Sequence, residues 1–233
     1  MKTEDLIQRV QSAYSKGAAS DDSRLSNRLI YNKLLTSRSR LFGQKLNKRQ
    51  KISQWNYQTL PCIELIEADK NECPCLPPAG CKWLKSKHPL PRVFTNLNVH
   101  IIEYVTSVDG AIDFSESTWI KVRNKKGNKY TANKPDYFIK DNYLYLTHPG
   151  GPRVVSLSGL FQDPLSAEYF PSFCDGADEI VDCQSPLDKE FPIDADDLDT
   201  LIEMAQKELV LMFSQMKEDL SNDSKDSVIQ NSK

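Results

Sequence analysis

The sequence of 233 residues predicts an α+β protein: a helical bundle formed by the two ends of the chain, with an inserted antiparallel β module, a small barrel or sandwich, and proline-rich irregular connectors. Three observations give this prediction. Apolar residues recur at helical spacing near both ends, they alternate at period two between residues 98 and 160, and prolines cluster between residues 55 and 91. With 39% apolar residues, the chain can bury a substantial core.

Two helices are expected at the start of the chain. The first, short and amphipathic, begins with Thr3 as its N-cap and ends at Tyr14. The second follows possible N-caps at residues 21–23 and ends at Gly43, or frays onward toward Lys51.

The middle of the chain predicts a β module over residues 98–160 between two irregular connectors, 55–97 and 161–189. Strands are expected at residues 62–66, 100–105, 112–114, 118–122, 137–139, 143–146 and 153–157, with turns at 109–110 and 140–142. The prolines exclude helix from the first connector, because each removes a backbone donor and restricts the preceding residue. One helical turn is expected near Pro164 to Phe170.

A last helix is expected to begin at Asp194 or Asp196 and to run to about Asp219, with acids at its positive end. It joins the N-terminal pair, so that residues 1–54 and 190–220 form the helical body. The polar tail, 221–233, has almost nothing to bury and is expected to be disordered when free.

The two ends of the chain carry opposite charge. Residues 24–51 contain nine Lys or Arg and no acid, whereas residues 194–223 contain nine acids and only two Lys. Solvated helices usually intersperse charges for pairing at i,i+4, so these helices are expected to form interfaces. The candidate interface residues are Arg24, Arg28, Arg38, Arg40, Lys48, Arg49, Asp196, Asp197 and Asp199. The basic stretch could face the acidic helix, an acidic protein ring or a nucleic-acid backbone.

Six cysteines are expected to be free thiols, because the chain is long and has no recognisable secretion signal. Four of them, Cys62, Cys73, Cys75 and Cys81, are weak candidates for a zinc site, since the C-x-C spacing is uncommon among zinc ligands. A small zinc-stabilised interaction protein is therefore one alternative.

No enzyme is predicted. The three histidines stand at no catalytic spacing from Cys, Ser or carboxylates, and phosphate-binding and nucleophile motifs are absent from the sequence, so no cofactor is expected. No apolar run is long enough for a membrane span. With a net charge of −2, nucleic-acid binding would depend on the basic helix 24–51, which is the main alternative function.

Several segments resemble a known family. These are DDSRLSNRLIY (21–31), LLTSRSRL (34–41), KISQWNYQTLPC (51–62) and LSGLFQDPL (157–165), together with Cys174 and FPID (191–194). They are similar to the virion structural proteins of crAss-like podoviruses that infect Bacteroidales. The resemblance spans nearly all of the chain except the tail.

The resemblance implies a ring or adaptor protein of the tail barrel, or head-to-tail connector, below the portal. Such proteins form dodecameric rings that continue the portal channel for DNA. The chain would then be made in the bacterial cytoplasm and would reside in the virion. Its partners would be further copies of itself, the portal protein and neighbouring ring proteins, with phage DNA in the lumen.

Overall fold

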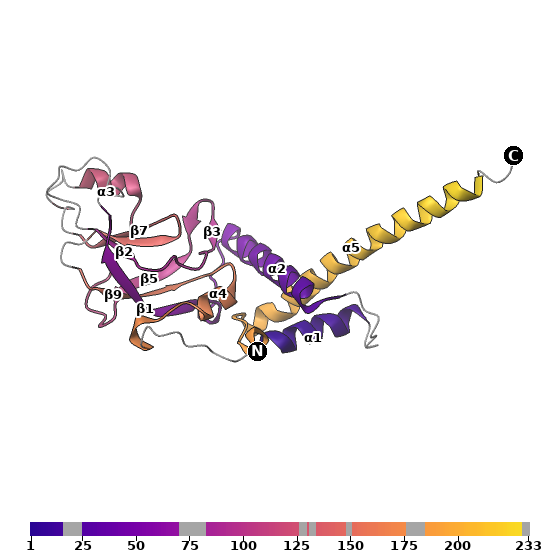
Figure 1. Ribbon diagram of the computed structural model, residues 1–233, viewed down its shortest axis with the longest axis horizontal. Helices are drawn as coiled ribbons and strands as arrows, with labels where there is room; N and C mark the ends of the chain where they lie inside the picture. The colour runs from indigo at the N-terminus through magenta and orange to yellow at the C-terminus, as the bar shows by residue number, and fades with distance from the viewer. Residues whose placement is uncertain are drawn as a thin grey trace. The chain divides into compact units, whose positions relative to one another are not determined.

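A computed structural model describes residues 1–15, 25–69, 83–125, 130, 134–147, 151–175 and 185–229, excluding the side chains of 123–125, 175 and 214–229. The chain divides into two compact units (Figure 1). One comprises Met1–Ile52 and Ser185–Lys233, and the other comprises Ser53–Gln184. The α+β class is confirmed, since long helices occupy the first unit and the described strands belong to the second.

The helical unit contains α1 (Thr3–Tyr14), α2 (Asn27–Asn47), a 3₁₀ turn η4 (Pro186–Asp188) and α5 (Ala195–Ile229). The bounds of α1 match the prediction, but the N-cap of α1 is Lys2, and the Thr3 hydroxyl donates to the Lys189 carbonyl at 2.9 Å.

The start of α2 and the end of α5 differ from the prediction. Ser26 caps α2 by accepting a hydrogen bond from the Leu29 N–H at 3.2 Å, and the helix continues through Gly43. The backbone of α5 is helical as far as Ile229, so the expected end at Asp219 was wrong.

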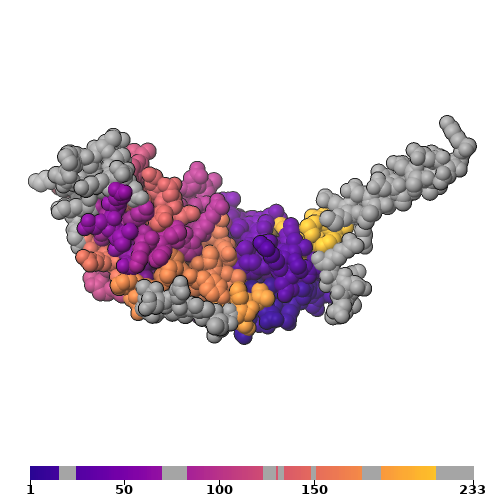
Figure 2. All heavy atoms as spheres, in the orientation of Figure 1, coloured from indigo at the N-terminus to yellow at the C-terminus, as the bar shows by residue number. Residues whose placement is uncertain are grey.

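One apolar cluster joins the three long helices. Its buried residues are Leu6, Ile7 and Val10 of α1, Ile30 and Leu34 of α2, Leu201, Ala205 and Leu209 of α5, and the flanking Leu25 and Phe191. Figure 2 shows the first part of α5 (yellow) lying against the N-terminal helices (indigo). Since burying one Leu or Ile side chain contributes about 1.5–3 kcal/mol, this cluster is a main source of stability for the helical unit.

The second unit is built on a seven-stranded sheet in the order β5-β9-β1-β2-β8-β7-β6. Its strands are β1 (Gln58–Glu67), β2 (Leu84–Ser86), β5 (Ile102–Ser107), β6 (Ser115–Glu116), β7 (Asp136–Lys140), β8 (Tyr143–Leu146) and β9 (Val154–Gly159). A separate hairpin consists of β3 (Thr95–Asn96) and β4 (Val99–His100). The short helical segments are η1 (Gln54–Asn56), α3 (Trp119–Lys125), α4 (Pro164–Glu168) and η3 (Phe173–Asp175).

The sheet nearly closes into a barrel. At one edge, Asp113 pairs with Thr106 of β5, and the Phe114 N–H donates to the Val105 carbonyl at 2.9 Å. The chain then continues directly into β6, which pairs with β7 at the other edge of the sheet. That last pairing is parallel, so the sheet is mixed and not purely antiparallel as predicted.

The expected irregular connector over residues 55–97 supplies two strands of this sheet. β1 pairs with both β9 and β2, and it is twice the length of the predicted strand 62–66. Pro61 is compatible with a strand because the register shifts between Leu60 and Ile63, so its missing N–H falls at an irregularity of the ladder.

The predicted strand 118–122 was wrong, because residues 119–122 belong to α3. The helical spacing places Trp119 and Val122 on one side, over the outer face of the sheet. There Trp119 packs edge-on against Trp83 at 5.2 Å and Phe138 at 5.6 Å between ring centroids. Phe138 in turn stacks on its cross-strand partner Tyr145 at 4.9 Å. The β-branched residues of this segment favour a strand locally, but the burial of its aromatic side chain against the sheet stabilises a helix instead.

A disulfide links Cys62 of β1 to Cys174 of η3, with the two Cα atoms 5.7 Å apart. The expectation of free thiols was therefore wrong for this pair, and Cys62 is excluded from the candidate zinc set. Cys73, Cys75, Cys81 and Cys183 lie outside the described residues.

We predict that replacing both cysteines of this pair, Cys62→Ala with Cys174→Ala, lowers the free energy of unfolding of the oxidised protein by about 2–4 kcal/mol. The physical reason is that the bond closes a loop across 112 residues of sequence and so restricts the unfolded chain. Urea denaturation measures the change. The same variant compared with the parent in excess reductant should show little difference, and an equal loss under both conditions would contradict the assignment.

Candidate assembly surfaces

Ion pairs join α2 and α5 along their contact. Glu208 of α5 forms ion pairs with Arg40 and Lys33 of α2, with nitrogen–oxygen distances of 2.9 Å and 3.6 Å. Lys45 of α2 pairs with Asp197 of α5 at 2.5 Å. The lower-numbered α2 residue meets the higher-numbered α5 residue, so the two helices run antiparallel. The opposite charges of the chain ends are thus in part neutralised within one subunit.

Asp197 is the most buried of the acidic interface candidates, at 5% exposure, and its second carboxylate oxygen has no hydrogen-bond partner among the described atoms. It lies in the first turn of α5, where the helix dipole favours a negative charge. Burial of a carboxylate is costly unless a cation accompanies it, and Lys45 provides that cation. Asp197 is therefore paired within its own chain.

Arg38 is also buried, at 2% exposure. Its guanidinium lies over the ring of Phe42 at 4.6 Å and near that of Phe191 at 5.8 Å, and its Nε donates to the Pro192 carbonyl at 3.3 Å. Arginine suits this position because its planar, weakly hydrated head can stack on aromatic rings. This side chain is enclosed by its own chain and displays no charge on the surface.

The other candidates lie on the surface of the helical unit. Arg28 is exposed in α2, Lys48 and Arg49 are exposed at its end, and Asp196 and Asp199 are exposed at the start of α5. Arg40 is half-exposed while pairing with Glu208. Arg24 lies outside the described residues.

Arg49 has an unusual backbone conformation, with φ of 56°. Its N–H donates to the Leu46 carbonyl and the Gln50 N–H donates to the Lys45 carbonyl, both at 2.9 Å, which closes α2 in a Schellman motif. This left-handed position normally holds glycine, because an L side chain costs about 1 kcal/mol there. An exposed arginine at this place does not serve the local fold.

The α5 segment Leu209–Phe213 is apolar around the whole helix. Leu209 is buried and Phe213 packs against Tyr14 at 5.8 Å between ring centroids, whereas Val210 is 48% and Leu211 61% exposed. A helix that is apolar on all sides is usually buried. From the sequence, helical spacing places Leu209, Met212 and Phe213 on the internal apolar face and does not single out Val210 and Leu211, although five consecutive apolar residues were an available signal.

Metal and membrane sites find no support in the described part of the chain. Among those residues, no group of three or more His, Cys, Asp or Glu side chains could hold a metal ion. No described helix is long and apolar enough to cross a bilayer.

These features define a protein with charged and apolar surfaces on a helical unit, joined to a nearly closed β barrel. Comparison with known families identifies its class: residues 5–230 match the crAss-like family described as phage tail ring protein 2, and the chain belongs to this family. It is therefore a structural protein of the phage tail ring type, and the expected family is confirmed. No curated protein matches the chain.

We predict that Lys45→Met lowers the free energy of unfolding by about 3 kcal/mol, because it leaves the Asp197 carboxylate buried without its cation. The double variant Lys45→Met with Asp197→Leu should recover most of this loss. As a control, Lys207→Met breaks the exposed pair between Lys207 and Glu203, and it should change stability by less than about 0.5 kcal/mol. Equal effects of Lys45→Met and Lys207→Met in urea denaturation would contradict the structural role of the buried pair.

Proposed function

We propose that this protein is the subunit of a homo-oligomeric ring in the tail barrel, below the portal, at the head-to-tail connector. Family membership supports a tail ring protein. The proposal adds a ring of twelve copies, contact with the portal or with neighbouring ring proteins, and a lumen through which phage DNA leaves the particle. Its role is structural, without catalysis.

The exposed apolar turn at Val210 and Leu211 is the observation that carries this proposal. A ring subunit must bury one surface against the next copy, and the two surfaces that meet in such a head-to-tail contact differ. Aliphatic side chains on a helix of the body provide the apolar part of one such surface.

The charged residues that do not pair within the described part of the chain provide electrostatic complementarity between neighbouring copies. Arg28, Lys48 and Arg49 lie at α2, and Asp196 and Asp199 lie at α5. Opposite charges on two surfaces guide association and fix its register, although they add little to affinity when exposed. We infer that these residues belong to contacts between neighbouring copies.

We predict that the double variant Val210→Ser with Leu211→Ser weakens ring formation at least tenfold and leaves the melting temperature of the subunit nearly unchanged. About half of Val210 and more than half of Leu211 is exposed in the single chain, and this exposed apolar area would be buried only in the ring. Mass photometry across a dilution series measures assembly. Lys207→Ser, an exposed polar position on the same helix, is the matched control, and rings that persist equally in both variants would contradict the proposal.

Substitutions of Arg49 should change the stability of the single chain and the stability of the ring in opposite directions. Arg49→Gly should raise the free energy of unfolding by about 1 kcal/mol, because glycine prefers the left-handed conformation. The same substitution should weaken the ring, whereas Arg49→Lys should retain it, since only the charge serves the contact. A ring that is unaffected by Arg49→Gly would remove Arg49 from the interface.

A further inference from the structure

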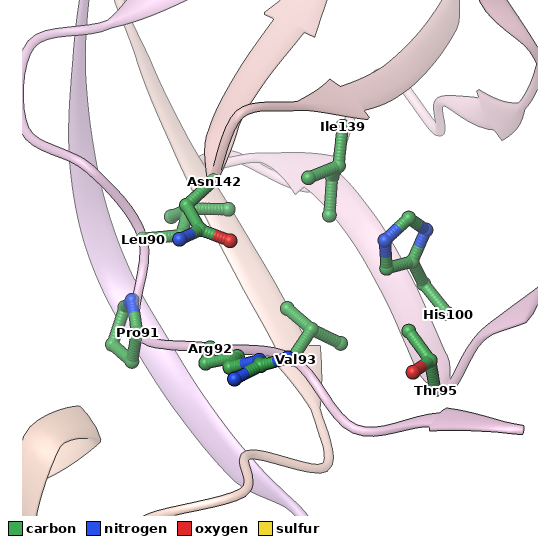
Figure 3. A pocket seen from close by; sticks show the side chains of 8 residues that line it. All are labelled: Leu90, Pro91, Arg92, Val93, Thr95, His100, Ile139 and Asn142. Atoms are coloured by element: carbon green, nitrogen blue, oxygen red, sulfur yellow. The ribbon is translucent and has the colours of Figure 1, made fainter. Parts of the chain in front are cut away.

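The β unit has a small hollow of about 180 Å³ beside the β3–β4 hairpin (Figure 3). It is lined by Leu90, Pro91, Arg92, Val93, Thr95, His100, Ile139 and Asn142. The lining joins the segment before β3, both strands of the hairpin, β7 and the turn that follows β7. Its position is fixed in part by the Leu90 N–H, which donates to the Asn142 carbonyl at 2.6 Å.

The polar lining of the hollow favours a negatively charged guest. Arg92 brings a permanent positive charge, and none of the eight lining residues is acidic. In Figure 3 the imidazole of His100 turns a ring nitrogen toward the space that Arg92 and Ile139 also border. Its Nδ1 lies 3.9 Å from Glu116 Oε1. A carboxylate can accept hydrogen bonds from a guanidinium and from an imidazole N–H at the same time.

The size of the hollow limits what can enter. Pockets for cofactors and drug-sized ligands usually measure about 300–1,000 Å³. A volume of about 180 Å³ therefore suits a single amino-acid side chain. The apolar residues Leu90, Val93 and Ile139 can contact the methylene groups of such a side chain, while its carboxylate meets Arg92 and His100.

The adjacent hairpin gives a second, independent indication. Its turn residues Leu97 and Asn98 both have positive φ, 49° and 64°. Asparagine is common in this conformation, but leucine is not, and Leu97 is also 84% exposed. An apolar side chain presented so openly at the turn of this hairpin indicates a protein surface as the partner, since a small molecule would fill the hollow alone.

We propose that this hollow accepts an aspartate or glutamate side chain of a tail protein of another kind, and that apolar residues next to that acid contact Leu97. The choice of partner rests on the proposed function, in which the helical unit makes the contacts between copies and leaves the β unit to face a different protein. The hollow and the hairpin together form one docking site, which we term the acid socket.

Carboxylate binding by the acid socket can be measured on the intact protein, whatever its oligomeric state. The probe is N-acetylglutamate α-amide, with N-acetylglutamine α-amide as the uncharged control, and the signal is the δ1 methyl resonance of Ile139. We expect a saturable shift with millimolar affinity for the glutamate probe only, and at least tenfold weaker binding in Arg92→Gln. No saturable shift, an equal response to both probes, or unchanged binding by Arg92→Gln would overturn the acid socket.

The partner is tested by co-expression with the portal and the other tail proteins. Leu97→Asn introduces a residue that tolerates the positive φ of the turn, so this variant should fold normally. We expect Leu97→Asn and Arg92→Gln each to reduce the complex with one of these proteins at least tenfold, while the mass of the homo-oligomer stays the same. Loss of the homo-oligomer in these variants, or an unchanged complex, would contradict the assignment. Failure of the parent protein to form rings would refute the proposed function, and the probe titration would still report on the socket.

Discussion

Glu208 of α5 forms ion pairs with Lys33 and Arg40 of α2. At the other end of the same helix–helix contact, Asp197 forms an ion pair with Lys45. The helical unit depends on this contact, because it joins residues 152 to 175 positions apart in sequence and completes the cluster into which α1 packs. The apolar residues between the ion pairs supply most of the stabilisation, since a partly exposed pair contributes at most about 1 kcal/mol. The ion pairs define the antiparallel register, because a displaced helix would leave Asp197 buried without a cation.

This internal pairing divides the charged residues of the chain ends into two groups. Lys33, Arg40, Lys45, Asp197 and Glu208 stabilise the subunit, and Arg38 is enclosed by aromatic rings. The exposed charged residues of α2 and α5 can contact neighbouring molecules, and so can Val210 and Leu211 of α5. In the proposed ring, fold and assembly therefore draw on different residues of the same two helices. Because the internally paired residues and the exposed residues are different, substitutions can test folding and assembly independently.

Some of this could be predicted from the sequence. The bounds of α1 and the β7–β8 hairpin follow from local signals, an apolar stripe in one case and a turn between alternating strands in the other. Other features depend on residues far apart in the chain. Pro61 is read locally as a strand breaker, but β1 pairs with two strands around it, and the Cys62–Cys174 bond spans 112 residues. The basic helix likewise indicates an interface, while only the fold shows that Lys45 has an internal partner and that Arg38 is buried.

A symmetric cryo-EM reconstruction of the purified, assembled protein tests the central claim most directly, because it shows which chain supplies each partner of Glu208. The account predicts a closed ring in which Lys33 and Arg40 of the same chain contact Glu208, and in which Val210 and Leu211 are buried against the next copy. A ring in which Lys33 and Arg40 of a neighbouring copy contact Glu208, with Val210 and Leu211 still facing solvent, would contradict it.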